Sequence, residues 1–245
     1  MTVSGKTVQE RVQKEKSKDQ DVITPVKKPL RENSGFLVLS GNLFDSALMK
    51  TSVISKDFKT RFLSKSGEKN VLKAKAVVFE GPEDYHDRLN DPELQIDEKT
   101  ILFIRGVGCI GYPGSAEVVN MQPPDKLLKE GISHLPTVGD GRQSGTSESP
   151  SILNASPESV VGGGLAFLKT GDPVTLDLNN CTLNAEIPVA EWEARKQAWT
   201  APEIKNHTPW QEIYRKNVGQ LADGGCLELA TAYKKIAKII PRDNH

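Results

Sequence analysis

Apolar residues occur in short runs along this chain, and several runs alternate apolar and polar positions. Alternation with a period of two is typical of strands that bury one face. Asn179-Asn180 separates two alternating runs, which indicates a hairpin. The run at 35–41 is bounded by glycines and is expected to be a buried strand. We expect strands over residues 35–41, 71–79, 100–105, 173–178 and 182–187.

Other segments carry the signals of helix starts. Pro82 follows Gly81, and Thr208-Pro209-Trp210-Gln211 reads as a capping box with proline at the first helical position. A helix beginning near Ser156 has to cross Gly162-Gly163-Gly164, so we expect close packing against these glycines. We expect helices from 82, over 123–131, over 156–168, over 189–199, from 208 to 220–224, and over 227–240.

Two polar stretches are predicted to lie outside the core. Residues 6–20 are mostly charged, with Val8 and Val12 one helical turn apart, and indicate an exposed helix or an ordered arm that leads into an extended segment at 22–30. Residues 55–70 are rich in lysine and serine and indicate a solvated connection.

Short strands that alternate with short helices predict a particular fold class. We expect an α+β fold that is mainly β, with a β-barrel-like core and peripheral helices. The sequence shows no internal repeat. We expect an N-terminal arm or linker over 1–33 and one barrel domain with a helical C-terminal extension over 34–245.

Composition excludes several classes of protein. The 245 residues carry 32 basic and 32 acidic side chains, so the zero net charge argues against a nucleic-acid partner. The apolar runs are too short for a membrane span, and the first residues lack the apolar stretch of a secretory signal. Cys109, Cys181 and Cys226 are too widely spaced for a metal-ligand motif or a disulfide framework. We expect reduced thiols and a cytoplasmic location, although the sequence does not distinguish an organelle.

Candidate chemistry gathers in two glycine-rich clusters that follow apolar segments. The first is Gly139-Asp140-Gly141-Arg142-Gln143-Ser144-Gly145-Thr146-Ser147, and the second runs from Arg105 to Glu117. Glycines allow a tight turn that presents a small side chain to a ligand, but a Gly/Ser cluster is equally typical of a surface loop. Gly106-x-Gly108-x-x-Gly111 matches the dinucleotide fingerprint in spacing only, because Pro113 lies where that fingerprint needs an opening helix.

Both clusters carry a family resemblance. Gly111-Tyr112-Pro113-Gly114-Ser115-Ala116-Glu117 and the Ser144 cluster resemble the dihydroxy-acid/6-phosphogluconate dehydratase family, and within it the sugar-acid (aldonate) dehydratases. Further matching stretches are Gly41-Asn42-Leu43-Phe44-Asp45, Gly81-Pro82-Glu83-Asp84-Tyr85, Asn154-Ala155-Ser156-Pro157-Glu158 and Pro241-Arg242-Asp243-Asn244-His245. The resemblance runs from Thr2 to His245 and covers the C-terminal part of such an enzyme.

The resemblance implies a swivelling β/β/α domain and a hydro-lyase (dehydratase) activity. It implies Ser144 as the catalytic base and Thr146 as a neighbouring hydroxyl, with Ser144, Gly145, Thr146 and His245 binding substrate. It implies Glu117 as a ligand of Mg²⁺, a role that suits a hard oxygen ligand. The alternative for Glu117 is a surface or capping carboxylate. Arg142 is expected to buttress its loop, and Cys109 to pack in the interior.

The family's other catalytic parts have no counterpart in this sequence. The resemblance implies an iron–sulfur cluster, [2Fe–2S] in preference to [4Fe–4S], held by an N-terminal dehydratase domain, which acts in cis or in trans. We therefore expect this chain alone to be incomplete and inactive. A fragment, a truncated gene model, a degenerate paralogue and one subunit of a split enzyme all fit the sequence. Glu148 adds a negative charge close to where an acid substrate would bind, which is expected to lower the affinity for that substrate.

Three functions stay open. The first is half of a dehydratase that converts a sugar acid to a 2-keto-3-deoxy acid, acting in a homo-oligomer. The second is a dihydroxy-acid dehydratase of branched-chain amino acid biosynthesis. The third is an inactive paralogue that acts as a binding module. Gln143, Thr146 and the tail from Arg242 to His245 favour the sugar-acid branch.

Overall fold

A computed structural model gives the structure of the chain. Backbone contacts divide it into two units, Met1–Ser34 and Gly35–His245. The structure describes residues 2–13, 22–30, 35–64, 68–115, 117, 120–143 and 148–231.

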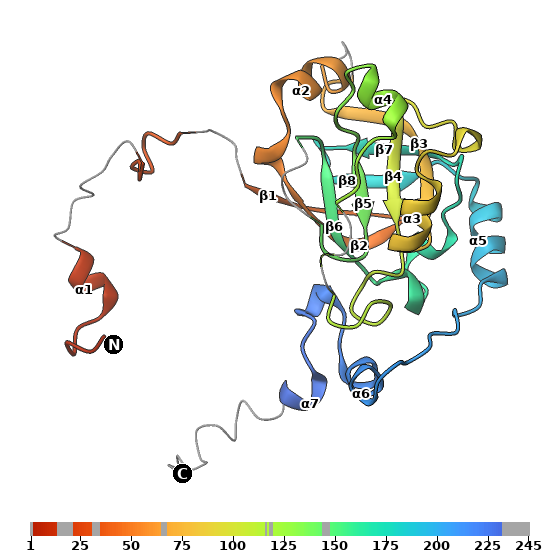
Figure 1. Cartoon of the computed structure of the whole chain (residues 1–245). Coiled ribbons are helices and arrows are strands. Elements are labelled where there is room, and N and C mark those ends of the chain that lie inside the picture. The colour runs from red at the N-terminus through yellow and green to blue at the C-terminus, as the bar shows by residue number, and fades with distance from the viewer. Residues whose placement is uncertain are drawn as a thin grey trace. The chain divides into compact units, whose positions relative to one another are not determined.

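Eight strands of the described chain close into a barrel in the second unit (Figure 1). Their order around the barrel is β1-β2-β6-β5-β4-β3-β7-β8, with both parallel and antiparallel neighbours. The strands are β1 (Phe36–Gly41), β2 (Phe44–Lys50), β3 (Val71–Phe79), β4 (Thr100–Ile104), β5 (Thr137–Gly139), β6 (Ser151–Ser156), β7 (Pro173–Asp177) and β8 (Thr182–Ala185). The predicted α+β fold with a mainly β, barrel-like core is confirmed.

Helices surround the barrel rather than crossing its interior (Figure 1). The α-helices of this unit are α2 (Lys56–Phe62), α3 (Pro82–Arg88), α4 (Asp125–Lys129), α5 (Val189–Ala198), α6 (Pro209–Asn217) and α7 (Glu228–Thr231). Short 3-10 turns are η1 (Thr51–Val53), η2 (Pro92–Leu94), η3 (Ser159–Val161), η4 (Gly164–Phe167) and η5 (Leu221–Asp223). Arg195 of α5 pairs with Asp172, just before β7, at 2.5 Å, and both side chains are almost buried.

Strand β4 shows how the two-residue period builds the core. All five of its residues are buried. Ile101 and Phe103 join the apolar cluster formed with residues of the other strands, whereas Leu102 and Ile104 join a second cluster with α3, η2 and α4. A strand with apolar residues on both faces is typical of a parallel sheet covered by helices.

Four neighbouring strands, β3 to β6, run parallel. The carboxyl ends of β4, β5 and β6 therefore meet at one rim of the barrel. Helices α6 and α7 lie at this end in Figure 1, and α2 and α4 lie at the other. This rim receives the first residues of both glycine clusters, because each cluster directly follows a strand.

Several predicted elements need correction. Strand β1 is not fully buried: Phe36, Val38 and Ser40 are exposed on one face, whereas Leu39 is buried on the other. The solvated connection expected at 55–70 contains helix α2, whose Ser55 caps the helix and whose Phe58 is buried. The helix expected over 156–168 is replaced by the two turns η3 and η4, although the close glycine packing is present. A Cβ on Gly163 would lie 1.8 Å from the Pro157 carbonyl oxygen.

The C-terminal helices are shorter than expected. Thr208 caps α6 through the Gln211 amide as predicted, but α6 ends at Asn217 and η5 follows it. Of the helix expected over 227–240, α7 covers Glu228–Thr231, and residues 232–240 lie outside the described part. Strands β2 and β6 were not predicted.

The first unit contains one short helix in its described residues, α1 (Val8–Val12), with a complete capping box between Thr7 and Glu10. None of the described side chains of this unit is buried, which agrees with an exposed helix. Residues 22–30 form turns rather than an extended segment. No helix in the described part of the chain combines the length and the apolar character needed to cross a bilayer.

Candidate functional site

Two glycine loops meet at the rim formed by the ends of β4 and β5. Asp140 joins them, because its carboxylate is fully buried and accepts hydrogen bonds from the Gly106 amide at 3.0 Å and the Val107 amide at 2.9 Å. It also accepts from the Ser159 amide at 2.9 Å and the Ser159 hydroxyl at 2.6 Å. Buried carboxylates require such donors, since an unpaired charge in the interior is costly. Asp140 thus fixes three segments, those that follow β4, β5 and β6.

The two loops also touch through their backbones. A Cβ added to Gly141 would lie 2.3 Å from the Val107 carbonyl oxygen, which is closer than any real contact. A Cβ on Gly111 would lie 2.5 Å from the Gly106 carbonyl oxygen, because the loop after β4 folds back on itself. Gly141 and Gly111 are therefore required by close backbone approach.

Glu158 is the second buried carboxylate at the rim. It follows β6 and accepts hydrogen bonds from the Ile110 amide at 3.0 Å, the Gly111 amide at 2.8 Å and the Gln220 side chain at 3.1 Å. Burial is the main cause that raises the pKa of the Glu158 carboxyl, and the donated hydrogen bonds oppose this shift. Asp140 and Glu158 together hold the loop after β4 from inside the barrel rim.

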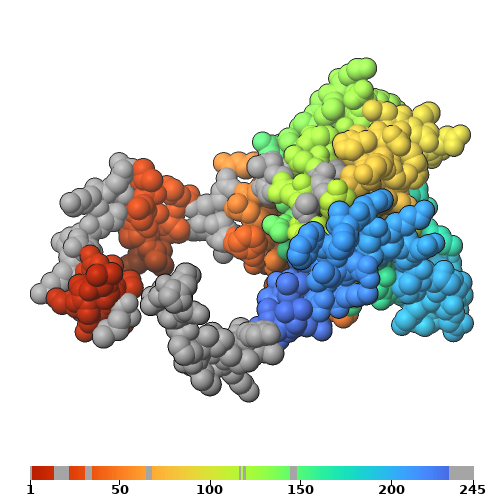
Figure 2. Space-filling model, turned by 60° about the horizontal axis from the view of Figure 1, so that its bottom comes forward, coloured from red at the N-terminus to blue at the C-terminus, as the bar shows by residue number. Residues whose placement is uncertain are grey.

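Two arginines hold the same loop from outside through its carbonyl oxygens. Arg215 of α6 donates to the Ile110 carbonyl at 2.8 Å and to the Gly111 carbonyl at 3.3 Å. Arg142 donates to the Gly114 carbonyl at 3.4 Å. Arg142 therefore buttresses the loop after β4 from its place in the loop after β5. Figure 2 shows the blue segment that contains α6 against the lime-coloured residues of this loop.

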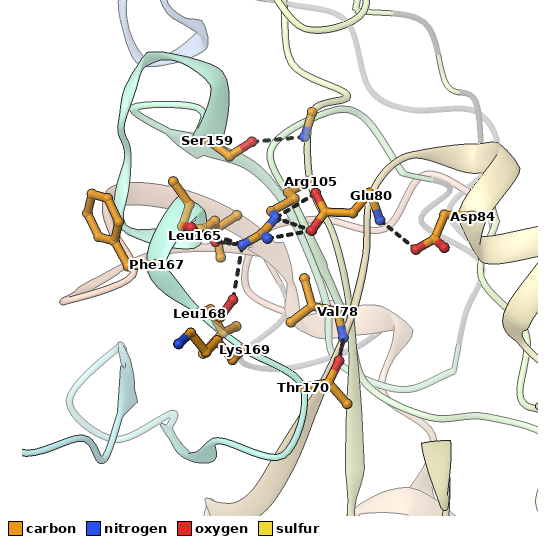
Figure 3. A network of polar contacts seen from close by, with 12 residues as sticks. Val78, Glu80, Asp84, Arg105, Ser159, Leu165, Phe167, Leu168, Lys169 and Thr170 are labelled. Atoms are coloured by element: carbon orange, nitrogen blue, oxygen red, sulfur yellow. Dashed lines mark hydrogen bonds and ion pairs between the residues drawn. The ribbon is translucent and has the colours of Figure 1, made fainter. Parts of the chain in front are cut away.

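Arg105, at the end of β4, forms a network that fixes the neighbouring turn. Its guanidinium pairs with the Glu80 carboxylate and donates to the carbonyls of Leu165 at 2.7 Å and Leu168 at 3.0 Å (Figure 3). These contacts occupy all the nitrogen atoms of the guanidinium group. Arg105 is consequently a structural anchor of η4.

A cavity of about 570 Å³ lies against the outer side of the loop after β4. Gly106, Gly111 and Trp199 are among the residues that line it. The cavity is lined by both acidic and basic side chains, so its charge does not favour an anionic ligand. These side chains are Glu80, Arg105, Glu203, Lys205 and His207.

Residues 21–226 match the family model described as the C-terminal region of dihydroxy-acid/6-phosphogluconate dehydratases. The chain belongs to this dehydratase family.

Named relatives agree with the family match. The chain is 56% identical over 245 residues to the D-xylonate dehydratase of Caulobacter vibrioides, covering 100% of the chain and 41% of the relative. It is 40% identical over 200 residues to an L-arabinonate dehydratase of Rhizobium leguminosarum, covering 81% of the chain and 33% of the relative. It is 31% identical over 230 residues to a dihydroxy-acid dehydratase of Acetivibrio thermocellus, covering 93% and 39%. The chain spans between one third and about two fifths of the length of these relatives.

The dehydratase residues predicted from the sequence are only partly described by the structure. Glu117 is described, and its side chain is exposed at the end of the loop after β4. Ser144, Gly145, Thr146 and His245 lie outside the described residues. The convergence of Ser144 with Glu117 stays a prediction, supported by the meeting of the two loops at Asp140.

Cys109 and Glu148 are both described by the structure. Cys109 is buried as expected, and burial is the main cause that raises the pKa of its thiol, so it does not favour a reactive thiolate. Glu148 lies at the amino ends of β5 and β6, away from the rim, because its carbonyl accepts from the Ser55 amide at 2.7 Å. Its carboxylate lies 4.0 Å from the His134 imidazole. Glu148 thus lies at the end of the barrel opposite Asp140, and its expected proximity to the Ser144 loop stays a prediction, because residues 144–147 lie outside the described part.

Sequence reasoning assigned no role to Asp140, Glu158 or Arg215, which together assemble this rim. Asp140 had a usable signal, because an acid between two glycines directly after a strand is well placed to accept backbone hydrogen bonds. Glu158 and Arg215 had no local sequence signal, since their partners Gly111 and Ile110 are 47 and 105 positions away in the sequence.

Proposed function

We propose that this chain is the C-terminal part of a sugar-acid dehydratase and supplies the barrel rim at the ends of β4 to β6 to its active site. The complete enzyme removes water from an aldonate to give a 2-keto-3-deoxy acid. The observation that carries the proposal is the family match combined with the Asp140 contacts, which bring the two glycine loops of the family motif to one rim. The identities of 56% and 40% to sugar-acid dehydratases, against 31% to a dihydroxy-acid dehydratase, favour the sugar-acid branch. Dihydroxy-acid dehydration is the second candidate.

In this proposal Ser144 removes the proton from the carbon next to the substrate carboxylate. Thr146 is a neighbouring hydroxyl donor, and the backbone of Gly145 approaches the substrate closely. A serine hydroxyl is a weak base, so its position and its electrostatic surroundings have to lower its pKa. Asp140 acts indirectly, by keeping the start of the Ser144 loop against the start of the Glu117 loop.

Glu117 suits a magnesium site in one respect. It is an exposed carboxylate at the end of a glycine loop, and Mg²⁺ is often bound by one or two carboxylates together with water and substrate oxygens. The described residues hold no group of three or more potential metal ligands, so other ligands have to come from outside this part of the chain. A bound Mg²⁺ would neutralise the substrate carboxylate and lower the pKa of a nearby hydroxyl.

An iron–sulfur cluster does not fit the described residues. Cys109 is buried, Cys181 is half-buried and Cys226 is exposed, and no group of three potential ligands contains them. We propose that the cluster, [2Fe–2S] in preference to [4Fe–4S], is held by an N-terminal dehydratase domain in cis or in trans. The complete enzyme is proposed to be a cytoplasmic homo-oligomer, in which His245 contributes its imidazole or terminal carboxylate to substrate binding.

The test uses a chimaeric dehydratase, in which this chain replaces the matched 41% of the Caulobacter D-xylonate dehydratase. Ser144→Ala should lower kcat by more than the roughly hundred- to ten-thousand-fold that a positioned base contributes, with little change in KM, because no other residue of the loop replaces the alkoxide. Ser147→Ala is the matched control and should leave kcat nearly unchanged. A Ser144→Ala enzyme that keeps more than about a tenth of the rate would assign the base to another group, Thr146 first.

A binding module without catalytic activity is the alternative from another class. It predicts that the chimaeric dehydratase folds and binds D-xylonate but does not turn it over. Turnover of D-xylonate or L-arabinonate, with 2,3-dihydroxyisovalerate unreacted, would support the sugar-acid proposal over both alternatives.

A further inference from the structure

The surface next to the Glu117 loop contains an apolar groove. Pro113 and Gly114 form one wall, and Trp210, Ile213 and Tyr214 of α6 form another. The groove has a volume of about 440 Å³ and is completed by Gln211, Asn217, Leu227 and Leu229.

The apolar side chains of the groove are unusually exposed. Trp210 is 77% exposed, and Ile213 and Leu229 are each 50% exposed. They lie together, because positions 210, 213, 214 and 217 fall on one face of a helix. Grouped apolar side chains on a surface indicate an interaction site, whereas scattered ones do not.

The lining argues against a small polar ligand. Ligand pockets usually present several polar groups that fix the orientation of the ligand. Here the Asn217 side-chain amide donates to the Ile213 carbonyl at 2.6 Å, and the Gln211 side chain accepts from the His207 amide at 2.6 Å. The polar side chains of the lining are thus turned toward the chain's own backbone, which leaves an apolar surface suited to a protein partner.

We propose that the groove is a docking surface for the part of the dehydratase that lies outside this chain. This inference rests on the proposed function. The chain covers 41% of the Caulobacter relative, so more than half of that enzyme has to be accommodated around it. Gly114 lines the groove and lies three positions before Glu117, so a domain that completes a metal site at Glu117 has to pass beside the groove.

A domain that docks at this groove also contacts the surface around it. A stable protein interface buries about 800 Å² on each partner, so the groove would be the apolar centre of a larger contact. Trp210 and Tyr214 are of the residue types that dominate binding energy at such centres. Pro113, Gly114 and the α6 residues lie within the family match over 21–226, so two walls of the groove belong to the matched region, whereas Leu227 and Leu229 lie just beyond it.

The first test is hydroxyl-radical footprinting of Trp210, read by peptide mass spectrometry. Trp210 should be oxidised rapidly in the 245-residue chain and several-fold more slowly in the chimaeric dehydratase. Trp192 is the internal control, because it packs edge-on against Phe167 away from the groove and should change little. Equal rates at Trp210 in the two proteins would overturn the proposal.

Other occupants give different results. If Trp210 is already protected in the 245-residue chain at high dilution, the chain covers its own groove and the proposal is wrong. If its protection in either protein disappears on dilution, a second copy is the occupant and the proposal is also wrong.

A variant pair gives an independent measurement. Ile213→Glu should lower the Tm of the chimaeric dehydratase by several degrees but leave the Tm of the 245-residue chain nearly unchanged, because Ile213 is half exposed there. Val189→Glu is the matched control, since Val189 is 78% exposed at the start of α5. This variant should leave the Tm of both proteins unchanged. A parallel fall of Tm in both proteins for Ile213→Glu would contradict docking.

These readouts are independent of turnover. An inactive chimaera with a protected Trp210 would disprove the proposed function and support the docking surface. An active chimaera with a freely oxidised Trp210 would support the proposed function and disprove the docking surface.

Discussion

The Asp140 carboxylate lies 2.9 Å from the Val107 amide nitrogen, although the two residues are 33 positions apart in the sequence. The contact links the first residues after β5 to the first residues after β4. Parallel strands bring their carboxyl ends to one edge, but they do not fix the paths of the loops that follow. A buried carboxylate with four donors does fix them, because each donor left unpaired would cost free energy.

We expect Asp140→Asn to destabilise the barrel. The amide keeps one acceptor and turns an NH₂ group toward backbone N–H donors, so at least one donor loses its partner. The free energy of unfolding should fall by about 1–3 kcal/mol, measured by urea denaturation of the 245-residue chain. Asp45→Asn, at an exposed position of β2, is the control and should have little effect. In the chimaeric dehydratase, Asp140→Asn should lower kcat more than it raises KM, and a loss in KM alone would contradict a positioning role.

Gly141→Ala tests the close backbone approach between the loops. The added Cβ would lie 2.3 Å from the Val107 carbonyl oxygen, so one of the two loops has to shift. The expected destabilisation is about 1–3 kcal/mol, as for other overpacked sites. Gly35→Ala is the matched control, because an added Cβ there meets no atom within 4 Å and the backbone needs no positive φ. Similar unfolding free energies for both variants would mean that the loops can separate without cost.

Glu158 gives the chain a specific pH dependence. Burial raises the pKa of its carboxyl in the folded state, so the folded chain holds this proton to higher pH than the unfolded chain does. The stabilising contribution of protonated Glu158 is complete below the ordinary glutamate pKa of about 4.3 and is lost as the pH rises through the folded-state pKa. The carboxyls of Asp97 and Asp177, whose pKa values are lowered, give the opposite slope.

Glu158→Gln should remove this contribution. Because glutamine resembles the protonated form, the variant should lose less stability than the parent chain when the pH is raised from about 4.5 to 7. The measurement is urea denaturation of both proteins across this range, compared as a difference so that the other carboxyls cancel. Identical pH profiles would show that Glu158 titrates normally in the folded chain.

The extent to which the fold was predictable depends on local patterns. Strand β4 was predictable, because Thr100 to Ile104 is an apolar run with residues for two packed faces. Strand β6 was missed, since Ser151, Asn154 and Ser156 dilute its apolar signal and its neighbours on the barrel supply the burial. Helix α2 was not predicted, because its lysines made the segment resemble a solvated connection. Phe58 and Phe62 nevertheless lie one turn apart, and their ring centroids are 4.8 Å apart.

The rim was predictable in outline but not in its contacts. The glycine motifs identified both loops and Glu117 through their family resemblance. The tertiary partners of Glu158 could not be predicted, because its burial depends on the path of the loop after β4 and on Gln220 from a distant segment. Gly141 was recognisable as a turn residue, whereas the close approach to Val107 that requires it depends on the register of β4 against β5.

The purified 245-residue chain should bind no iron–sulfur cluster. A cluster is usually held by four cysteine thiolates, and this chain has three cysteines. Cys109 is buried with a raised thiol pKa, which opposes the thiolate that ligation needs. After anaerobic reconstitution with iron and sulfide, the desalted chain should contain no stoichiometric iron and show no sulfur-to-iron absorption band. The chimaeric dehydratase, treated in parallel, is the positive control and should show both. Stoichiometric iron in the 245-residue chain would contradict the prediction. If the iron persists in a Cys109→Ala variant, Cys181 and Cys226 would be the ligands. If the iron is lost in that variant, Cys109 would be a cluster ligand, and its assignment to packing would be wrong.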